Sequence, residues 1–334
     1  MSKFLDRIAE RARTDRKTIV LAEGDDIRTI CASAMAIKKG IANIIILGDE
    51  TVISEMATNE NLDISAATIL NPETDSRTEE FANQFYEMRK AKGMTEEKAL
   101  ETLKNPLYFG CMLVKNNMAD GMVAGAVNST SNVLRSALTT VKTAPDAKIV
   151  SAFFVICVPD CEYGENGIFI FGDSGLVEDP DAEKLSEIAI SSAKSFKKLV
   201  EATPNVALLS YSTYGSAASP LVDKVALATK LAKEKRPDMN IDGELQLDAA
   251  IDESVGKFKA PDSSVAGKAN VLIFPDLNAG NIGYKLAQRL GKAEAYGPIT
   301  QGIAKPVNDL SRGCTADDIM GVIAITCVQA QDNN

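Results

Sequence analysis

Residues 18–47 read TIVLAEGDDIRTICASAMAIKKGIANIIIL and predict a strand, a helix and a second strand, in that order. The apolar, β-branched runs Thr18–Ala22 and Asn43–Leu47 are typical of buried strands, whereas Thr29–Lys39 has the pattern of an amphipathic helix. A crossover helix of this kind joins two parallel strands of one sheet. This segment therefore predicts an α/β fold.

The same alternation continues along most of the chain. Five further apolar runs are predicted strands: Gly121–Ala124, Ile149–Val158, Gly167–Phe171, Val206–Ser210 and Val271–Phe274. Five further segments are predicted helices: Phe4–Thr14, Glu79–Ala91, Ser131–Thr140, Ala182–Leu199 and Leu221–Glu234. Strands that alternate with helices indicate α/β architecture with mostly parallel sheets.

The length of 334 residues predicts two domains, because a single core rarely grows so large. Two polar segments that contain proline, Lys142–Asp146 and Ala295–Pro298, mark the expected borders. We expect residues 1–146 and 298–334 to form the first domain and residues 147–297 to form an inserted second domain. Ligand sites are common between domains, so we expect the active site in the cleft between these two.

The chain contains no histidine, and this absence limits its chemistry. It excludes Ser-His-Asp and Cys-His nucleophilic catalysis and any metal site built on histidine. The segment Gly172-Asp173-Ser174-Gly175 looks like a serine-protease signature, but without histidine we interpret it as a turn. Proton transfer must then depend on Asp, Glu, Lys, Tyr or Cys.

The formal charge of −10 argues against binding to nucleic acid, which needs a basic surface. No apolar run approaches the roughly 20 residues of a membrane span, and the first residues lack the features of a signal peptide. We therefore expect a cytoplasmic protein with no membrane partner. Its six cysteines form no C-x-x-C pair and are expected to be reduced thiols, with Cys314 nearest to any chemistry.

The segment Lys305–Cys314, which reads KPVNDLSRGC, carries the clearest functional signal. It continues through Thr315-Ala316-Asp317-Asp318 into an apolar run at Ile319–Val328, so a loop here enters a helix. The amino terminus of a helix presents free N–H groups and a positive dipole end to an anion. Arg312 adds a donor fork that matches phosphate. We interpret the segment as an anion site with a candidate base, Asp318, beside it.

Asp318 also has a structural interpretation. Thr315 and Asp318 are spaced as a capping box, with Thr315 as the N-cap and Asp318 at the third helical position. The neighbouring Ser311 and Arg312, and the lack of histidine, favour a catalytic role. Capping and catalysis both stay open at this point.

Three other loops follow predicted strands and precede predicted helices. In Leu21–Arg28, Arg28 either contacts a phosphate or is a solvated residue after a turn that Asp26 caps. Ala126–Arg135, which reads AVNSTSNVLR, is either an anion cradle or a hydroxyl-rich N-cap. Pro275–Tyr284 resembles a nucleotide-binding turn but lacks the G-x-G-x-x-G spacing.

Together these motifs closely resemble the phosphate acetyltransferase (phosphotransacetylase) family, in its short, single-unit form. The resemblance covers essentially the whole chain. It is carried by Leu21–Arg28, Asn105–Gly110, Gly125–Arg135, Phe171–Asp173, Tyr211–Ser216, Pro275–Gly283 and Pro306–Asp318.

The resemblance implies reversible acetyl transfer between acetyl phosphate and coenzyme A. It also implies a homodimer whose two-domain fold is similar to that of isocitrate and isopropylmalate dehydrogenases, and we expect residues 147–297 to form the dimer contact. Asp318 would take the thiol proton of coenzyme A, Ser311 would orient the thiol, and Arg312 would bind the phosphoryl group. The other expected ligands of the acyl phosphate or coenzyme A are Arg28 (near the nucleotide phosphates), Arg89, Arg135, Ser129, Thr130 and Tyr296. No metal and no other cofactor is expected, because acetyl phosphate already carries a good leaving group.

Three alternatives follow from the same residues. A phosphate butyryltransferase would run the same chemistry on a longer acyl chain. A nicotinamide-dependent decarboxylating dehydrogenase would need carboxylates gathered for Mg²⁺ and a clear adenosine site, neither of which the sequence shows convincingly. A non-catalytic module that binds coenzyme A is disfavoured by the presence of Ser311, Arg312 and Asp318 together.

Overall fold

The computed structural model describes residues 3–331, which form two compact units. One unit contains residues 5–145 and 303–331, and the other contains Lys3, Phe4 and Asp146–Gly302. The border expected between residues 297 and 298 falls inside a strand, Glu294–Gln301, and contacts group this whole strand with the second of these units. Among residues 3–331, every helix is too short or too polar to span a membrane.

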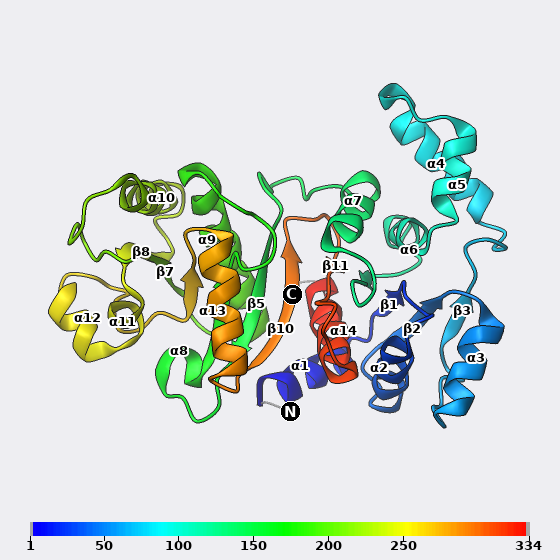
Figure 1. Ribbon diagram of the computed structural model, residues 1–334, viewed down its shortest axis with the longest axis horizontal. Coiled ribbons are helices and arrows are strands. Elements are labelled where there is room, and N and C mark those ends of the chain that lie inside the picture. Colours follow the sequence, from blue (N-terminus) through cyan, green and yellow to red (C-terminus); the bar gives the residue numbers. More distant parts are fainter. Residues whose placement is uncertain (1–2, 332–334) are drawn as a thin grey trace. The chain divides into compact units, whose positions relative to one another are not determined.

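The unit of residues 5–145 and 303–331 is built on a five-stranded parallel sheet with the order β11-β4-β1-β2-β3 (Figure 1). Its strands are β1 (Thr18–Leu21), β2 (Asn43–Leu47), β3 (Thr68–Leu70), β4 (Gly121–Val123) and β11 (Val307–Asn308). Its helices are α2 (Ile27–Lys38), α3 (Glu50–Asn59), α4 (Thr78–Arg89), η1 (Lys90–Lys92), α5 (Glu96–Leu103), α6 (Pro106–Lys115), α7 (Thr130–Thr140) and α14 (Ala316–Ala330). α1 (Lys3–Thr14) begins in the other unit and continues into this one.

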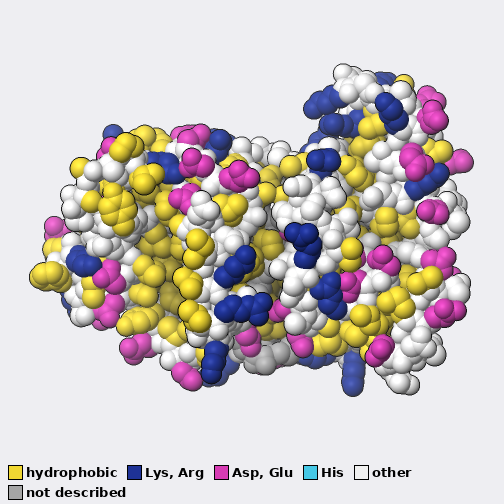
Figure 2. All heavy atoms as spheres, in the orientation of Figure 1, with side chains coloured by type: hydrophobic (Ala, Val, Ile, Leu, Met, Phe, Trp, Pro, Cys, Tyr) yellow, Lys and Arg dark blue, Asp and Glu magenta, His cyan; other side chains and the backbone are white. Residues whose placement is uncertain are grey.

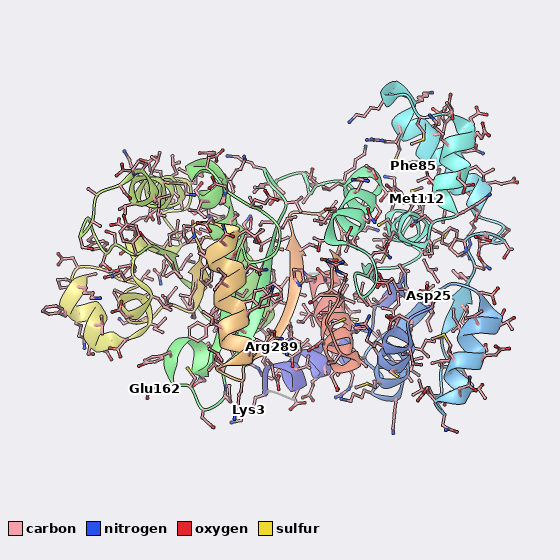
Figure 3. All side chains as sticks on the ribbon, viewed as in Figure 1. Lys3, Asp25, Phe85, Met112, Glu162 and Arg289 are labelled. Carbon is pink, nitrogen blue, oxygen red and sulfur yellow. The ribbon has the colours of Figure 1, made fainter. Side chains whose placement is uncertain are left out.

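Helices cover both faces of this sheet, which explains why its central strands are almost wholly apolar. Figure 1 shows α2 and α14 on one face and α6 and α7 on the other. Phe85 of α4 and Met112 of α6, both marked in Figure 3, belong to one buried cluster. This cluster also contains Val20 of β1 and Met122 of β4. The packing fixes the strand ends from which the candidate site is built.

The unit that contains Asp146–Gly302 has a six-stranded sheet with the order β10-β5-β6-β9-β7-β8. The pairs β10–β5 and β5–β6 are antiparallel, and the other three pairs are parallel. The strands are β5 (Ser151–Cys157), β6 (Ile168–Gly172), β7 (Asn205–Leu209), β8 (Asn240–Leu245), β9 (Val271–Ile273) and β10 (Glu294–Gln301). The helices are α8 (Tyr163–Asn166), α9 (Ala182–Val200), α10 (Pro220–Lys235), α11 (Leu247–Ile251), α12 (Glu253–Lys259) and α13 (Leu277–Arg289).

The expected α/β fold with mostly parallel sheets is confirmed, and every predicted element occurs with its ends shifted by at most two residues. The sequence did not predict β3, β8, β10 or β11. β10 was not predicted because Gly297 and Pro298, which lie inside it, indicate a domain border in the sequence. Proline is tolerated there because β10 is an edge strand, and its register shifts between Tyr296 and Ile299.

Candidate active site

Three loops meet at one edge of the five-stranded sheet. They leave the carboxyl ends of the neighbouring strands β1, β4 and β11, and they lead into α2, α7 and α14 respectively. In open parallel sheets, ligands bind outside these strand ends. Asp25, marked in Figure 3, lies in the first of these loops. Six of the nine residues predicted for the site lie in the loops or at the first turns of their helices.

Glu23 ties the loop after β1 to the loop after β4. It is only 3% exposed, and its carboxylate accepts the backbone N–H groups of Gly125, Ala126, Val127 and Asn128 at 2.8–3.1 Å. The side-chain amide of Asn128 donates to it as well, at 2.9 Å. The sequence offered this loop as an anion cradle, and the anion that the structure shows in it is the protein's own carboxylate.

Arg28 ties all three loops together. Its Nε and Nη2 donate to the carboxylate of Asp26, and Nη2 also donates to the carbonyl oxygen of Ala126 at 2.9 Å. Its Nη1 donates to the carbonyl oxygens of Arg312 and Cys314 at 2.8 and 3.0 Å. The hydrogen bonds between Asp26 and Arg28 lower the pKa of the carboxyl group and raise that of the guanidinium. Arg28 is thus neither a solvated residue nor a free anion ligand here: its five N–H groups are directed at protein acceptors.

Asp26 also accepts the backbone N–H of Arg28 at 2.8 Å and caps α2, which is part of one of the two interpretations that the sequence left open. One carboxylate therefore starts a helix and orients the arginine that follows it. This local Asp-x-Arg unit explains how a short stretch of sequence can place a guanidinium over two distant loops. The contact of Arg28 with nucleotide phosphates, which the resemblance implied, stays a prediction.

Arg312, Arg135 and Arg89 differ from Arg28. Arg312 and Arg135 are exposed and Arg89 is partly exposed. Within residues 3–331, their guanidinium groups make no hydrogen bond or ion pair. Their charge is therefore available to an anion. Figure 2 shows basic side chains gathered near the place where Figure 1 labels α4, the helix that ends at Arg89.

Ser311 and Asp318 lie on either side of the start of α14. Ser311 Oγ accepts the N–H of Gly313 at 3.4 Å, and this contact shapes the turn. The carboxylate Oδ2 of Asp318 accepts the N–H and the hydroxyl of Thr315 at 2.8 and 2.9 Å. In return, Thr315 Oγ1 accepts the N–H of Asp318 at 3.2 Å, so the predicted capping box is present. The box uses Oδ2, and in the described chain Oδ1 makes no hydrogen bond.

Asp309 joins the loop after β11 to the first turn of α7, and sequence reasoning missed it. The hydroxyl of Thr130 donates to Asp309 Oδ2 at 2.5 Å. Ser129, the residue before it, caps α7 by accepting the N–H of Asn132 at 3.3 Å. Asp309 is 1% exposed, and burial raises its pKa to about 7. Its position directly after a strand was the only available signal, and burial cannot be read from that.

Cys314 is buried in the turn that Arg28 holds. Burial raises the pKa of its thiol to about 11, although the positive charge of Arg28 acts in the opposite direction. A thiol of this kind is almost wholly protonated at neutral pH, and the thiolate is the reactive form. The geometry therefore does not favour Cys314 as a nucleophile.

Tyr296 belongs to the other unit. It lies in β10, is 4% exposed, and donates its hydroxyl to Glu294. Its ring packs against Phe4. These contacts give it a structural role within that unit, and its predicted contact with the substrate stays a prediction. The Gly172–Gly175 segment is a turn as expected, in which Asp173 accepts the N–H groups of Gly175 and Leu176.

Comparison with known proteins identifies the family of this chain. The model of the family described as "Phosphate acetyl/butaryl transferase" matches residues 3–327. A phosphate acetyltransferase from Acetivibrio thermocellus is 62% identical over 328 residues, which are 98% of each chain. The chain belongs to this family. It is an acyltransferase, as the resemblance implied, and the family's substrates are coenzyme A and acetyl phosphate or phosphate.

Solved structures agree. A phosphotransacetylase from Streptococcus pyogenes is 42% identical, with a TM-score of 0.91 over 99% of both chains. A 4-hydroxythreonine-4-phosphate dehydrogenase from Klebsiella pneumoniae is 11% identical, with a TM-score of 0.54 over 95% of this chain and 100% of its own. The second likeness shows that the fold extends to a dehydrogenase, and it carries nothing about activity.

We predict that Arg28→Lys destabilises this family member and impairs the use of both substrates. A lysine cannot make the forked contacts, and each lost hydrogen bond from a charged group costs about 1.5–3 kcal/mol. Chemical denaturation and steady-state kinetics would measure the two effects. Arg135→Lys is the control, because the Arg135 guanidinium contacts no protein acceptor among residues 3–331, so its unfolding should match that of the wild type. An Arg28→Lys enzyme of unchanged stability that is impaired only in its KM for coenzyme A would instead make Arg28 a phosphate ligand.

Proposed function

We propose that this acyltransferase transfers acetyl groups reversibly between acetyl phosphate and coenzyme A by direct attack of the coenzyme A thiolate. The observation that supports the proposal most is the turn of Ser311 and Arg312. Arg28 holds the backbone of this turn by donating to the carbonyl oxygens of Arg312 and Cys314. The Arg312 guanidinium has no protein acceptor among residues 3–331, so it can bind a phosphoryl group. A pre-organised fork of this kind binds phosphate and stabilises the charge that develops on it.

Asp318 is the proposed base. A thiol with an ordinary pKa of about 8.5 is only a few per cent ionised at neutral pH, so a proton acceptor speeds its attack. In the proposed step the S–H proton passes to Asp318 Oδ1 while Oδ2 keeps its hydrogen bonds to Thr315. The thiolate sulfur forms a bond to the acetyl carbon, and the bond from that carbon to the phosphate oxygen breaks. Arg312 stabilises the departing phosphate, and Ser311 orients the thiol.

The remaining polar groups fit anionic substrates. Arg89 and Arg135 are proposed ligands of the acyl phosphate or coenzyme A, since neither has a protein acceptor in residues 3–331. Ser129 and Thr130 start α7, where helix N–H groups favour an anion. The mechanism uses the thiol of coenzyme A as its nucleophile, and the protonated state of Cys314 suits that assignment. We propose that no metal or redox cofactor takes part and that the enzyme is cytoplasmic.

We further propose that the chain forms a homodimer through the unit of Asp146–Gly302. Ile282, Leu286 and Leu290 are 58%, 52% and 77% exposed. They are spaced four residues apart along α13 and at its end, so they lie on one side of the helix. Figure 2 shows apolar side chains along this helix. An exposed apolar stripe of this kind is typical of a protein interface.

The function is tested by mixing the pure protein with acetyl phosphate and coenzyme A and measuring thioester formation. We expect acetyl-CoA to form in the presence of a chelator and without nicotinamide, and more slowly with butyryl phosphate. Arg312→Ala should raise the KM for acetyl phosphate by about ten- to hundredfold, because it removes a charge-assisted contact, and Arg312→Lys should restore part of the loss. Folded protein that forms no thioester would contradict the proposal.

The role of Asp318 is tested by separating capping from catalysis. Asp318→Asn keeps an oxygen that can accept from Thr315, so it should cost about 1 kcal/mol of stability at most. If Asp318 is the base, turnover should fall by about 10²–10⁴-fold. Thr315→Val is the matched control, because it weakens the capping box and leaves the carboxylate: stability should fall and turnover should largely persist. A well-folded Asp318→Asn enzyme with near-normal turnover would reduce Asp318 to a capping residue.

The dimer is tested by light scattering. The wild type should have the mass of two chains, and Ile282→Glu combined with Leu286→Glu should have the mass of one, because burying two carboxylates in an apolar interface is costly. Val52→Glu, on an exposed position of α3, is the control and should leave the mass unchanged. A wild type that is monomeric at all concentrations would refute the interface.

A further inference from the structure

The carboxyl group of Asp309 has no part in the mechanism above, yet it is the most unusual polar group in the described chain. Its Oδ1 is buried and makes no hydrogen bond, and among the buried side-chain oxygens and nitrogens of residues 3–331 it is alone in this. Its other oxygen, Oδ2, accepts the hydroxyl of Thr130, and the neighbouring backbone N–H of Leu310 also favours the ionised form. Buried polar groups without a partner are costly and rare in native proteins, which points to a function.

The surroundings of Oδ1 are closed. Gly125 lies next to it with a φ of +117°, and a Cβ atom on this residue would come within 2.3 Å of Oδ1. Burial raises the pKa of Asp309, the hydrogen bonds from Thr130 and from the N–H of Leu310 lower it, and the charge of Glu23, from the loop after β1, raises it further. From α7, the facing residue is Thr130, which does not titrate. No cation among these neighbours stabilises an ionised Asp309.

The hydrogen bond between Asp309 and Thr130 differs between the two protonation states. An ionised carboxylate can only accept, so the single hydroxyl hydrogen of Thr130 must point at Oδ2. A neutral carboxyl group can donate its own hydrogen from Oδ2 to Thr130 Oγ1. The hydrogen of Thr130 is then free to point elsewhere. The protonation state of Asp309 therefore determines whether the Thr130 hydroxyl donates to Asp309 or is free to donate to a ligand.

Thr130 is placed to use that donor on an anion. It is partly exposed and is the first residue of α7. Ser129 caps the N–H of Asn132, and within residues 3–331 the N–H groups of Thr130 and Ser131 have no acceptor. An anion at this helix end would thus meet two N–H groups and, when Asp309 is neutral, one hydroxyl. An ionised Asp309 would withdraw that hydroxyl and also repel the anion.

We propose that Thr130 and Asp309 form a proton-linked contact for the phosphate group of the acyl phosphate, in which protonation of Asp309 releases the Thr130 hydroxyl to donate to the substrate. The inference rests on the proposed function and deepens it, because it makes Asp309 a positioning residue for substrate binding. Its pKa of about 7 places the change near neutral pH. Acyl-phosphate binding should then weaken as the pH rises through neutrality.

The test compares the wild type with Asp309→Asn. The amide nitrogen of an asparagine can donate to Thr130 at every pH, so this variant imitates the neutral acid. The KM for acetyl phosphate and for coenzyme A would be measured from about pH 6 to about pH 8.5, and the ratio of wild type to variant taken at each pH. Titration of the substrates cancels in that ratio. We expect the acetyl phosphate ratio to rise by up to about tenfold per pH unit above the pKa of Asp309, and the coenzyme A ratio to stay flat.

Two further variants separate this contact from a merely structural role. Thr130→Val removes the hydroxyl and should raise the KM for acetyl phosphate at low pH by about ten- to hundredfold. Its KM for acetyl phosphate should still rise with pH, but less steeply than that of the wild type, because the repulsion by ionised Asp309 remains while the hydroxyl no longer contributes. Thr130→Ser keeps the hydroxyl and should behave as the wild type. A ratio that stays flat for acetyl phosphate in active enzymes, or a Thr130→Val enzyme with an unchanged KM, would overturn the inference.

Failure of the proposed function gives a different result. In that case the wild type forms no thioester at any pH, so no KM value can be measured for it. If Asp309→Asn does not fold, calorimetry on the wild type replaces it. Sulfate binding would be measured near neutral pH in two buffers of different ionisation enthalpy, because sulfate itself does not titrate there. Net proton uptake on binding is expected, and binding without proton exchange would refute the coupling.

Discussion

The site depends on the guanidinium of Arg28, which holds three loops that the sheet alone does not join. Parallel pairing brings the ends of β1, β4 and β11 to one edge, but it leaves the loops beyond them free to move. Arg28 fixes them by directing its donors to Ala126, Arg312 and Cys314. All three acceptors are backbone carbonyl oxygens, so Arg28 sets the path of the chain; a further acceptor, Cys314 Sγ, lies 3.9 Å from Nη1.

Two buried carboxyl groups complete this arrangement in opposite ways. The carboxylate of Glu23 accepts hydrogen bonds from five N–H groups, and these bonds replace the water that it loses on burial. Asp309 accepts the hydroxyl of Thr130, and the N–H of Leu310 also lowers its pKa, but burial outweighs both and raises the folded-state pKa to about 7 from an ordinary value of 3.8. Between these values the folded chain holds a proton that the unfolded chain releases. Any stability linked to that proton is therefore complete below about pH 4 and is lost as the pH rises through about 7. Asp309 thus lowers the stability of the fold at neutral pH, and residues that do so are often found at functional sites.

The sequence predicted the parts of the site that depend on neighbouring residues. The capping box of Thr315 and Asp318, the N-caps in the loops before α2 and α7, and the seven predicted strands depend on short, local patterns. The long-range contacts carried no such signal. Glu23 and Gly125 are 102 positions apart, Thr130 and Asp309 are 179 apart, and Arg28 and Arg312 are 284 apart. Their acceptors and donors are mostly backbone groups, which every residue has. A loop rich in N–H donors could thus be recognised, but not the fact that Glu23 fills it.

The distribution of charges at the site explains how an acidic chain can bind anions. A formal charge of −10 repels phosphate at long range, so binding must depend on a few groups at contact distance. Arg28 neutralises Asp26 and contributes little further charge, and Glu23 adds a negative charge at the edge of the site. In the proposed mechanism, the positive charge that a substrate meets comes from Arg312, Arg135 and Arg89, together with the helix ends of α7 and α14. In such a balance one further negative charge matters. The proposed control of binding by the ionisation of Asp309 therefore requires no contact between that aspartate and the substrate.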